Sequence, residues 1–150
     1  MEDILIREAR EQDIARILEL YREAGIEAEQ GFTPQEAGVH LALFLRYPCL
    51  RVFVAEVQGE VVGTYELLIM DNLAKRGRRS GVVEDVAVAP RLHRRGIGRA
   101  MMLHAQQQCR QAGCYKLVLS SGLKRTGAHD FYDATGFEKH GYSFRVDVES

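Results

Sequence analysis

The sequence predicts an α+β, or mixed α/β, domain in which helices flank one sheet, and three observations support this class. The chain has 150 residues, of which 46% are hydrophobic and 27% are charged, so it is long enough to bury one sizeable core. Apolar residues recur at helical spacing in some segments and form short β-rich runs in others. The segments follow the order β-α-α-β-β-β-α-β-α-β, which is typical of one sheet covered by helices. We therefore expect a single domain over residues 1–150.

The first third of the chain predicts one strand and two helices. A short apolar run over 4–7 precedes a helix whose apolar face comprises Ile14, Ile17, Leu18 and Tyr21. A second helix is expected to begin at Pro34, because Thr33 is a cap residue and Glu36 is placed for a capping box. Its expected apolar face comprises Val39, Ala42 and Leu43.

The middle of the chain predicts sheet, and the C-terminal part alternates between helix and strand. The β-rich runs over 51–57 and 61–70 should pair as an antiparallel hairpin, because Gln58 and Gly59 between them offer a turn. The later expected elements are a strand over 81–89, a helix from 97 to 112, a strand over 115–120, a short helix over 128–135 and an extended segment over 137–148.

Composition and charge exclude several classes of protein. The formal net charge is −1, which lacks the general electrostatic attraction of a nucleic-acid or anionic-membrane binder. The three cysteines have no CxxC spacing and do not cluster with histidines at metal-ligand intervals. The N-terminus begins with acids, and no apolar run approaches about 18 residues. We expect a cytoplasmic protein without a metal, a nucleic-acid partner or a membrane partner.

The segment from Glu84 to Ala100 departs from the usual rules for a helix start. After Pro90 it holds a basic loop with Arg91, Arg94, Arg95 and Arg99. Gly96 and Gly98 remove side chains where the backbone turns into the helix, so main-chain N–H groups can face an anion. Basic residues at a helix start are unfavourable unless an anion is bound there. The segment therefore predicts a pyrophosphate cradle, with a solvated basic loop as the alternative.

Two common phosphate-binding motifs do not fit this segment. A Walker loop requires Lys and then Ser or Thr after the last glycine, whereas Gly98 is followed by Arg99 and Ala100. A dinucleotide-binding GxGxxG motif requires a third glycine where Met101 stands. Neither ATP nor NAD is favoured.

The same segment resembles the signature of the GNAT superfamily of acyl-CoA-dependent N-acetyltransferases. In that signature Gln or Arg, two residues, Gly, one residue, and Gly or Ala follow a strand directly. His93 replaces the first residue, and the stretch from Arg94 to Gly98 matches the rest. A second stretch, from Ala128 to Phe137, is similar to the family's AxxFYxxxGF segment. The resemblance is nearly chain-wide and implies a GNAT-like central mixed, mostly antiparallel sheet flanked by helices.

Shorter segments are similar to two groups within the superfamily. The stretches 83–88 and 113–116 are similar to glucosamine-phosphate N-acetyltransferases. Lys124 and Arg125 before Ala128 are similar to aminoalkylphosphonate N-acetyltransferases. Because these likenesses point to different acceptors, the acceptor stays open.

The resemblance implies that acetyl-CoA binds as the acetyl donor substrate. In the family the strand at 84–88 carries a bulge and splays from the strand at 115–120, and the pantetheine arm of CoA lies in the opening. Core packing of Val86 and Val88 is compatible with that role. By analogy, the donor-binding residues would be Val86, Ala87, Val88, Arg94, Arg95, Gly96, Ile97, Gly98 and Arg99.

The resemblance also implies direct acetyl transfer, in a ternary complex, to a primary amine of a small molecule. Tyr132 matches the family's tyrosine that protonates the leaving thiolate, and the alternative is a packing role beside Phe131 and Phe137. Glu84 is the expected general base, acting through water. Asp85 stays an alternative because a bulge makes strand parity unreliable, and a cross-strand ion pair is the structural alternative for both.

Other classes of function remain open at this stage. A non-catalytic acyl-CoA-binding regulatory module would keep the glycine cradle without the proton chemistry, and a protein or peptide N-acetyltransferase would share the donor site. The resemblance makes a homodimer one further expectation, since the β-rich C-terminus offers an edge for it. The basic loop from Lys75 to Arg79 is expected either to meet an anionic acceptor or to be solvated.

Overall fold

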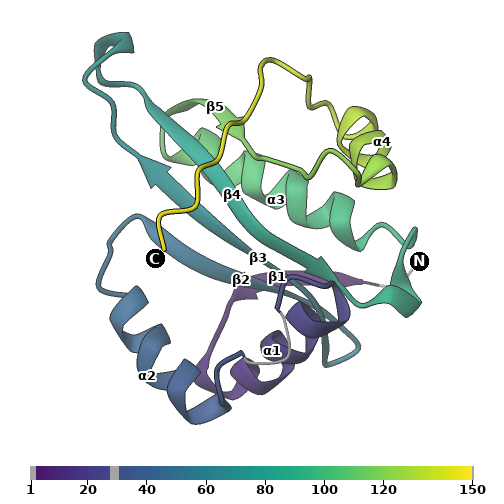
Figure 1. Cartoon of the computed structure of the whole chain (residues 1–150). Coiled ribbons are helices and arrows are strands. Elements are labelled where there is room, and N and C mark those ends of the chain that lie inside the picture. The colour runs from purple at the N-terminus through teal and green to yellow at the C-terminus, as the bar shows by residue number, and fades with distance from the viewer. Residues whose placement is uncertain (1–2, 28–30, 150) are drawn as a thin grey trace. The chain divides into compact units, whose positions relative to one another are not determined.

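The computed structural model describes residues 3–27 and 31–149, and its contacts divide the chain into two compact units, Met1–Val118 and Leu119–Ser150. The second unit holds one helix, α4 (Thr126–Ala134). The elements of the first unit, in chain order (Figure 1), are β1 (Ile4–Glu8), α1 (Ile14–Glu23), α2 (Pro34–Phe44), β2 (Leu50–Val57), β3 (Glu60–Met70), β4 (Arg79–Val88), α3 (Ile97–Gln111) and β5 (Cys114–Val118).

The five strands form one sheet in the order β1-β2-β3-β4-β5. Strands β1 to β4 pair antiparallel with their neighbours, whereas β5 pairs parallel with β4. The predicted hairpin is β2 with β3, in which Phe53 lies opposite Tyr65. The expected central mixed, mostly antiparallel sheet flanked by helices is therefore confirmed.

Neighbouring residues of β3 face different helices. The Tyr65 hydroxyl lies 2.7 Å from Nδ1 of His104 on α3, whereas the Glu66 carboxyl lies near the Tyr21 hydroxyl of α1. Figure 1 shows α1 and α2 on one side of the sheet and α3 on the other. Arg16 of α1 also donates to the carbonyl oxygen of Val61 at 3.0 Å. These contacts hold α1 against the centre of the sheet.

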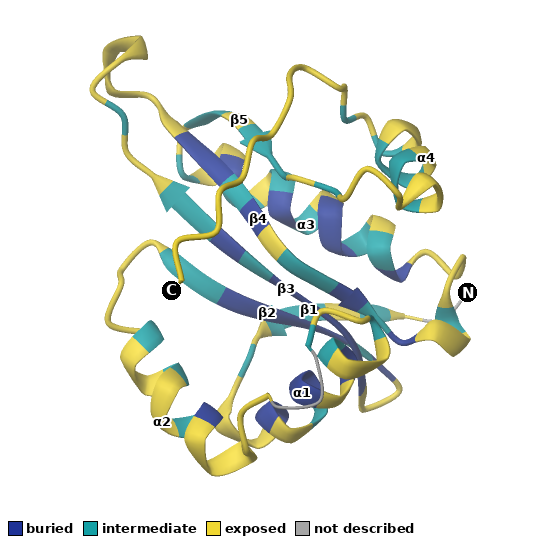
Figure 2. Ribbon diagram, viewed as in Figure 1, coloured by how far each residue is buried: buried dark blue, intermediate teal, exposed yellow. Residues whose placement is uncertain are grey.

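The predicted helix face is confirmed for α1, and the prediction for α2 is wrong. Ile14, Ile17 and Leu18 of α1 are buried, as are Ile97, Met101 and Ala105 of α3 (Figure 2). In α2 the predicted face, comprising Val39, Ala42 and Leu43, is exposed. The buried residue there is Ala37, which packs with the partly buried Leu41 against α1. Because α2 packs on one helix rather than on the sheet, only a narrow strip of its surface is covered.

Local signals set the start of α2 as expected. The Thr33 side chain accepts a hydrogen bond from the Glu36 main-chain N–H, and the Glu36 carboxylate accepts one from the Thr33 N–H at 2.9 Å. Each partner satisfies a donor that a helix start leaves unpaired.

The final segment of the second unit is not the strand that its alternating pattern predicted. Residues 137–149 form neither helix nor strand. Tyr142, Phe144, Val146 and Val148 are between 81% and 91% exposed. A strand requires a neighbour to complete its main-chain hydrogen bonds, and no backbone hydrogen bond within the described residues reaches 138–149. The sequence has the alternation of a strand, but the structure shows no strand pairing of this segment among the described residues.

Candidate functional site

The pairing of β4 with β3 is interrupted at the predicted catalytic acids. Thr64 lies opposite Ala87 and Glu66 lies opposite Glu84, so two residues of β4 face one residue of β3 between these pairs. Asp85 adopts a positive φ of 51°, a conformation that non-glycine residues seldom adopt. The bulge that the family resemblance implied is present. It alters the side-chain alternation along β4, as local insertions of this kind do.

The bulge gathers acidic side chains around Glu66. Burial is the main cause that raises the pKa of Glu66 to about 7, and the charge of Asp85, a hydrogen bond to Asp85 and the charge of Glu84 add to it. A hydrogen bond from Tyr21 acts in the opposite direction. Burial also raises the pKa of the Glu84 carboxyl, with the charge of Asp85 as the second cause. The pKa of Glu66 therefore lies near neutral pH, where the carboxyl can readily gain or lose a proton.

Glu84 and Asp85 both lie near Glu66, so neither alternative for the general base is removed by geometry. Glu84 is exposed, whereas Asp85 and Glu66 are half-buried. No ion pair links any of the three to a basic side chain in the described part of the chain. The expected structural alternative, a cross-strand ion pair, does not form there.

Beyond the bulge, the edge of β4 is open. The pairing of β4 with β5 ends at Val82 opposite Val118, so residues 83–88 have no β5 partner. Val86 and Val88 are half-buried and Ala87 is buried. A strand edge without a partner presents main-chain donors and acceptors to whatever lies beside it. The resemblance implies that β4 and β5 splay apart here; the structure shows that their pairing ends at Val82 and that β5 itself ends at Val118.

The loop after β4 presents unpaired main-chain donors at the start of α3. Helix α3 begins at Ile97, and its cap residue Gly96 has a φ of 84°. Arg94 also has a positive φ, of 65°. Among the described residues, no hydrogen bond reaches the N–H groups of 94–99, and the first turn of α3 holds no acidic side chain. Successive free N–H groups at a helix start form an anion-binding site.

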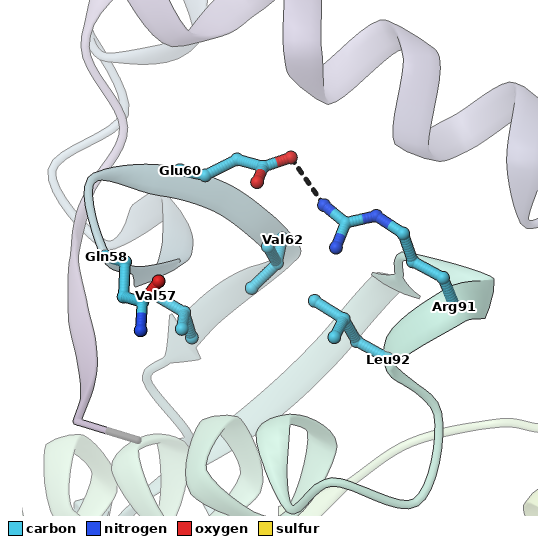
Figure 3. A pocket seen from close by; sticks show the side chains of 6 residues that line it. All are labelled: Val57, Gln58, Glu60, Val62, Arg91 and Leu92. Carbon is cyan, nitrogen blue, oxygen red and sulfur yellow. Dashed lines mark hydrogen bonds and ion pairs between the residues drawn. The ribbon is translucent and has the colours of Figure 1, made fainter.

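The arginines around this cradle differ in their partners. Arg91 forms an ion pair with Glu60 across a small hollow that Val57, Gln58, Val62 and Leu92 also line (Figure 3). Arg94, Arg95 and Arg99 are exposed, and none of them forms an ion pair within residues 3–27 and 31–149. Arg91 is therefore engaged, and the other three can contact an anion.

His93 fastens the loop to the strand that precedes it. Its Nε2 lies 3.1 Å from the carbonyl oxygen of Val88 and donates to it. The side chain at the position where the sequence departs from the family signature thus bonds to the end of β4 and leaves the N–H groups of 94–99 unobstructed. The departure at His93 is compatible with an intact cradle.

Tyr132 lies on α4 in the second unit. Burial raises the pKa of its hydroxyl, against a smaller lowering effect of Arg125, so the phenol carries its proton at neutral pH. The ring contacts Phe131 and Phe137 at centroid distances of 5.1 and 5.7 Å. The packing role is thus observed, and a polar role for the hydroxyl is compatible with it. His129 donates to the carbonyl oxygen of Gly122 at 2.8 Å.

Sequence reasoning missed Glu66 and Tyr21 as members of this site. Glu66 is the only acid in the run from Val61 to Met70, where alternation would place it on the same side as Val62 and Thr64. An acid in an otherwise apolar strand was the available signal. Tyr21 was assigned only to the apolar face of its helix, and nothing local indicates that its hydroxyl reaches β3.

Two further features of the chain bear on its class. None of the helices in the described residues has the length and apolar composition needed to cross a bilayer. In that same part of the chain, no three His, Cys, Asp or Glu side chains gather as a group that could hold a metal ion.

In the basic loop from Lys75 to Arg79, Arg78 lies 5.0 Å from the centre of the Tyr115 ring and Arg79 pairs with Asp71.

The sequence and the fold of this chain are matched by known proteins. A family model described as the acetyltransferase (GNAT) family matches residues 12–137. A solved structure of a putative acetyltransferase from Agrobacterium tumefaciens is 34% identical, with a TM-score of 0.89 over 95% of this chain and 99% of that one. The fold and site define a GNAT-type domain, and the chain belongs to the acetyltransferase (GNAT) family.

Curated relatives include both groups that short segments had indicated. The chain is 34% identical over 98 residues to a glucosamine 6-phosphate N-acetyltransferase of Trypanosoma brucei brucei, covering 65% of each protein. It is 31% identical over 86 residues to an aminoalkylphosphonate N-acetyltransferase of Salmonella typhimurium, covering 57% of this chain and 55% of that one. The matched segments thus span less than two thirds of the length of these relatives.

The acidic cluster predicts that removing the Glu66 charge stabilises the fold only at higher pH. The folded protein raises the pKa of Glu66 from 4.5 to about 7. The folded state favours the neutral Glu66 carboxyl. The stability that this neutral form contributes is therefore fully present below about pH 4.5 and is lost as the pH rises through about 7. The shift from 4.5 to about 7 corresponds to about 2.5 kcal/mol between about pH 5 and pH 8. Because solvent screens this partly exposed carboxyl, Glu66→Gln should gain about 1 kcal/mol, or about 2–4 °C in Tm, over that range relative to the native chain. Glu138→Gln, at an exposed position, is the control, and an equal Tm difference at both pH values would contradict the shifted titration.

Proposed function

We propose that this chain is an acetyl-CoA-dependent N-acetyltransferase that moves an acetyl group directly to a primary amine of a small molecule, in a ternary complex. The observation that carries the proposal is the row of unpaired N–H groups from Arg94 to Arg99, which follows the half of β4 that pairs with β3 but has no β5 partner on its other side. A diphosphate fits the first feature and an extended amide-bearing arm fits the second. CoA contains both.

Donor binding relies mainly on the backbone. The pyrophosphate accepts hydrogen bonds from the N–H groups of Gly96, Ile97, Gly98 and their neighbours, and the positive end of the α3 dipole adds to the attraction. Arg94, Arg95 and Arg99 supply positive charge around it. The pantetheine amides pair with main-chain groups of Val86, Ala87 and Val88, as an added strand would. Such a site tolerates His93, because the side chain there only holds the loop.

The reaction removes two protons from the nitrogen and supplies one to the sulfur. An amine that arrives as an ammonium ion first loses a proton, because only its free lone pair attacks the thioester carbonyl carbon. After attack the nitrogen loses a second proton, the carbon–sulfur bond breaks, and the leaving thiolate takes up a proton. The products are the acetamide, CoA with a free thiol, and one proton released to solvent.

We assign the first proton to Glu84, acting through water. Its exposed carboxyl has a raised pKa, which brings it closer to the operating pH of a general base. Asp85 is the alternative, because the bulge places both acids near Glu66. The negative charge of this cluster also favours an amine as the acceptor.

We assign the proton that the thiolate takes up to Tyr132. Its position matches the tyrosine of the family motif, and burial keeps its hydroxyl protonated at neutral pH. A phenol can protonate a thiolate, and no metal or covalent enzyme intermediate is needed. We further propose that the protein works in the cytoplasm, where its free thiols Cys49, Cys109 and Cys114 would stay reduced.

Replacing Gly96 should weaken donor binding. Gly96→Ala adds a Cβ that meets no atom within 4 Å, so its effect comes from the φ of 84°. Relaxing this strain displaces the N–H groups, and the Kd for CoA should rise on the order of tenfold. Calorimetry measures the constant.

Gly113→Ala is the matched control for this experiment. Gly113 follows the other end of α3, with a φ of 77° and no atom within 4 Å of an added Cβ. Its variant should bind CoA as the native chain does. Equal affinity for all three proteins, or no heat from the native chain, would contradict the cradle.

Removing the Tyr132 hydroxyl should slow turnover without weakening the donor complex. Tyr132→Phe keeps the ring contacts but loses the proton donor, so kcat should fall on the order of a hundredfold while the Kd for CoA is unchanged. Thiol release from acetyl-CoA, screened with amino sugars, aminophosphonates, polyamines, amino acids and aminoglycosides, measures the rate. Tyr47→Phe, at an exposed tyrosine, is the control. Full activity of Tyr132→Phe would remove this residue from the mechanism.

Two isosteric variants separate the candidate bases. Glu84→Gln should lower kcat/KM on the order of a hundredfold, because it removes the group that takes the first proton. Asp85→Asn should have a smaller effect, through the pKa values of its neighbours alone. The amine screen supplies the acceptor for both assays. A large loss in Asp85→Asn with near-native activity in Glu84→Gln would assign the base to Asp85 instead.

A further inference from the structure

The C-terminal end of α3 brings two cysteines together. The helix ends in a glycine cap, in which Gly113 has a φ of 77° and its N–H donates to the carbonyl oxygen of Arg110 at 3.1 Å. These are features of the Schellman motif, in which the third-last residue of the helix commonly contacts the residue that follows the glycine. In α3 these two residues are Cys109 and Cys114.

The two thiols lie near one another and differ in their surroundings. Cys109 is buried, whereas Cys114, the first residue of β5, is half-buried. The Cys109 sulfur fills the space that Gly81 of β4 leaves, because a Cβ at Gly81 would collide with it. The sheet therefore shields Cys109, and Cys114 is the more accessible of the pair.

Burial makes Cys109 unreactive by itself. It is the main cause that raises the pKa of this thiol to about 12, and the charge of Cys114 is the second cause. A thiol that keeps its proton reacts slowly with oxidants. Contact with a second sulfur offsets this, because a group held beside its target reacts at a high effective concentration. Cys109 is thus placed to react with Cys114 rather than with solutes.

We propose that Cys109 and Cys114 form an oxidation site that closes to a reversible disulfide. Hydrogen peroxide first oxidises Cys114: the O–O bond breaks, one oxygen forms a sulfenic acid on the sulfur, and the other leaves as water. The Cys109 sulfur then attacks the Cys114 sulfur, and the S–O bond breaks. The departing hydroxide takes the Cys109 proton and leaves as a second water. Two thiols and one peroxide thus give one disulfide and two waters, and a thiol reductant reverses the change.

In this reaction Cys109 protects Cys114 from irreversible damage. A sulfenic acid without a second thiol beside it is oxidised further to sulfinic and sulfonic acids, which thiols do not reduce. The inference does not depend on the acetyltransferase assignment, because neither cysteine belongs to the donor site or to the acidic cluster.

Cys49 is a matched control, because it is an exposed thiol that no other cysteine can reach. Its carbonyl oxygen accepts a hydrogen bond from the Ile69 N–H of β3 at 2.8 Å, and β3 and β4 separate it from β5. Three strand spacings place its backbone about 14 Å from β5. A disulfide requires Cα atoms within about 7 Å of one another.

Peptide mass spectrometry tests the site on the native chain. Protein treated with hydrogen peroxide, blocked with iodoacetamide and digested with trypsin is cut after Arg110, between the two cysteines. The peptides that hold Cys109 and Cys114 should appear joined, two hydrogen atoms lighter than the separate thiol forms, and dithiothreitol should release them. Cys49 should carry oxygen adducts instead.

Variants test the protective role of Cys109. At the same peroxide dose, Cys109→Ser and Cys109→Ala should each accumulate on the order of ten times more sulfinic acid at Cys114 than the native chain. Cys49→Ser should form the disulfide as the native chain does. Circular dichroism checks that each variant is folded. The proposal would be overturned by a native chain that gives no joined peptides, by disulfides that involve Cys49 instead, or by equal sulfinic acid at Cys114 with and without Cys109.

Discussion

The interruption of main-chain pairing along β4 is the constraint on which the rest of the site depends. As far as Val82 the strand pairs with β3 on one side and β5 on the other, and this part anchors it in the sheet. Further along, the bulge at Asp85 changes the register with β3, and the partner on the other side ends. The unpaired groups cost free energy unless something bonds to them. A ligand with its own donors and acceptors can hydrogen-bond to these main-chain groups. This is why an interruption in strand pairing can serve as a binding site.

The bulge also brings an electrostatic cost, because it places acids of β4 beside Glu66 of β3. Glu66 lies half-buried beside Asp85 and Glu84, and its pKa rises because a charged carboxyl there is poorly solvated and repelled by its neighbours. Such clusters destabilise the fold in its ionised form, and a cationic amine would relieve them. The cradle at α3 has the opposite sign. One end of β4 thus suits an anion and the bulge suits a cation, as the proposed phosphorylated donor and amine acceptor require.

Much of the architecture was predictable from the sequence because its signals are local. The capping box at Thr33, the helical spacing in α1 and α3, and the glycines at 96 and 98 each specify structure within a few residues. The face of α2 was not predictable, because it depends on which neighbour covers the helix. The strand expected over 137–148 failed for a related reason: alternation indicates what a segment can pair with, but not whether a partner is present.

The residues of the candidate site likewise differ in whether local sequence signals indicate them. The cradle and Glu84 could be proposed from the sequence because the motif around them is contiguous. Glu66 and Tyr21 were missed because they reach the bulge from β3 and α1, through long-range packing. Neither pattern nor composition places these two side chains beside Asp85.

The most direct measurement of the central claim follows main-chain amide resonances of isotope-labelled protein during a titration with CoA. The account predicts that the largest shifts occur at residues 94–99 and along the open edge of β4, with little change at the C-terminal end of α3. Saturable binding that leaves these amides unmoved, or no binding at all, would contradict it.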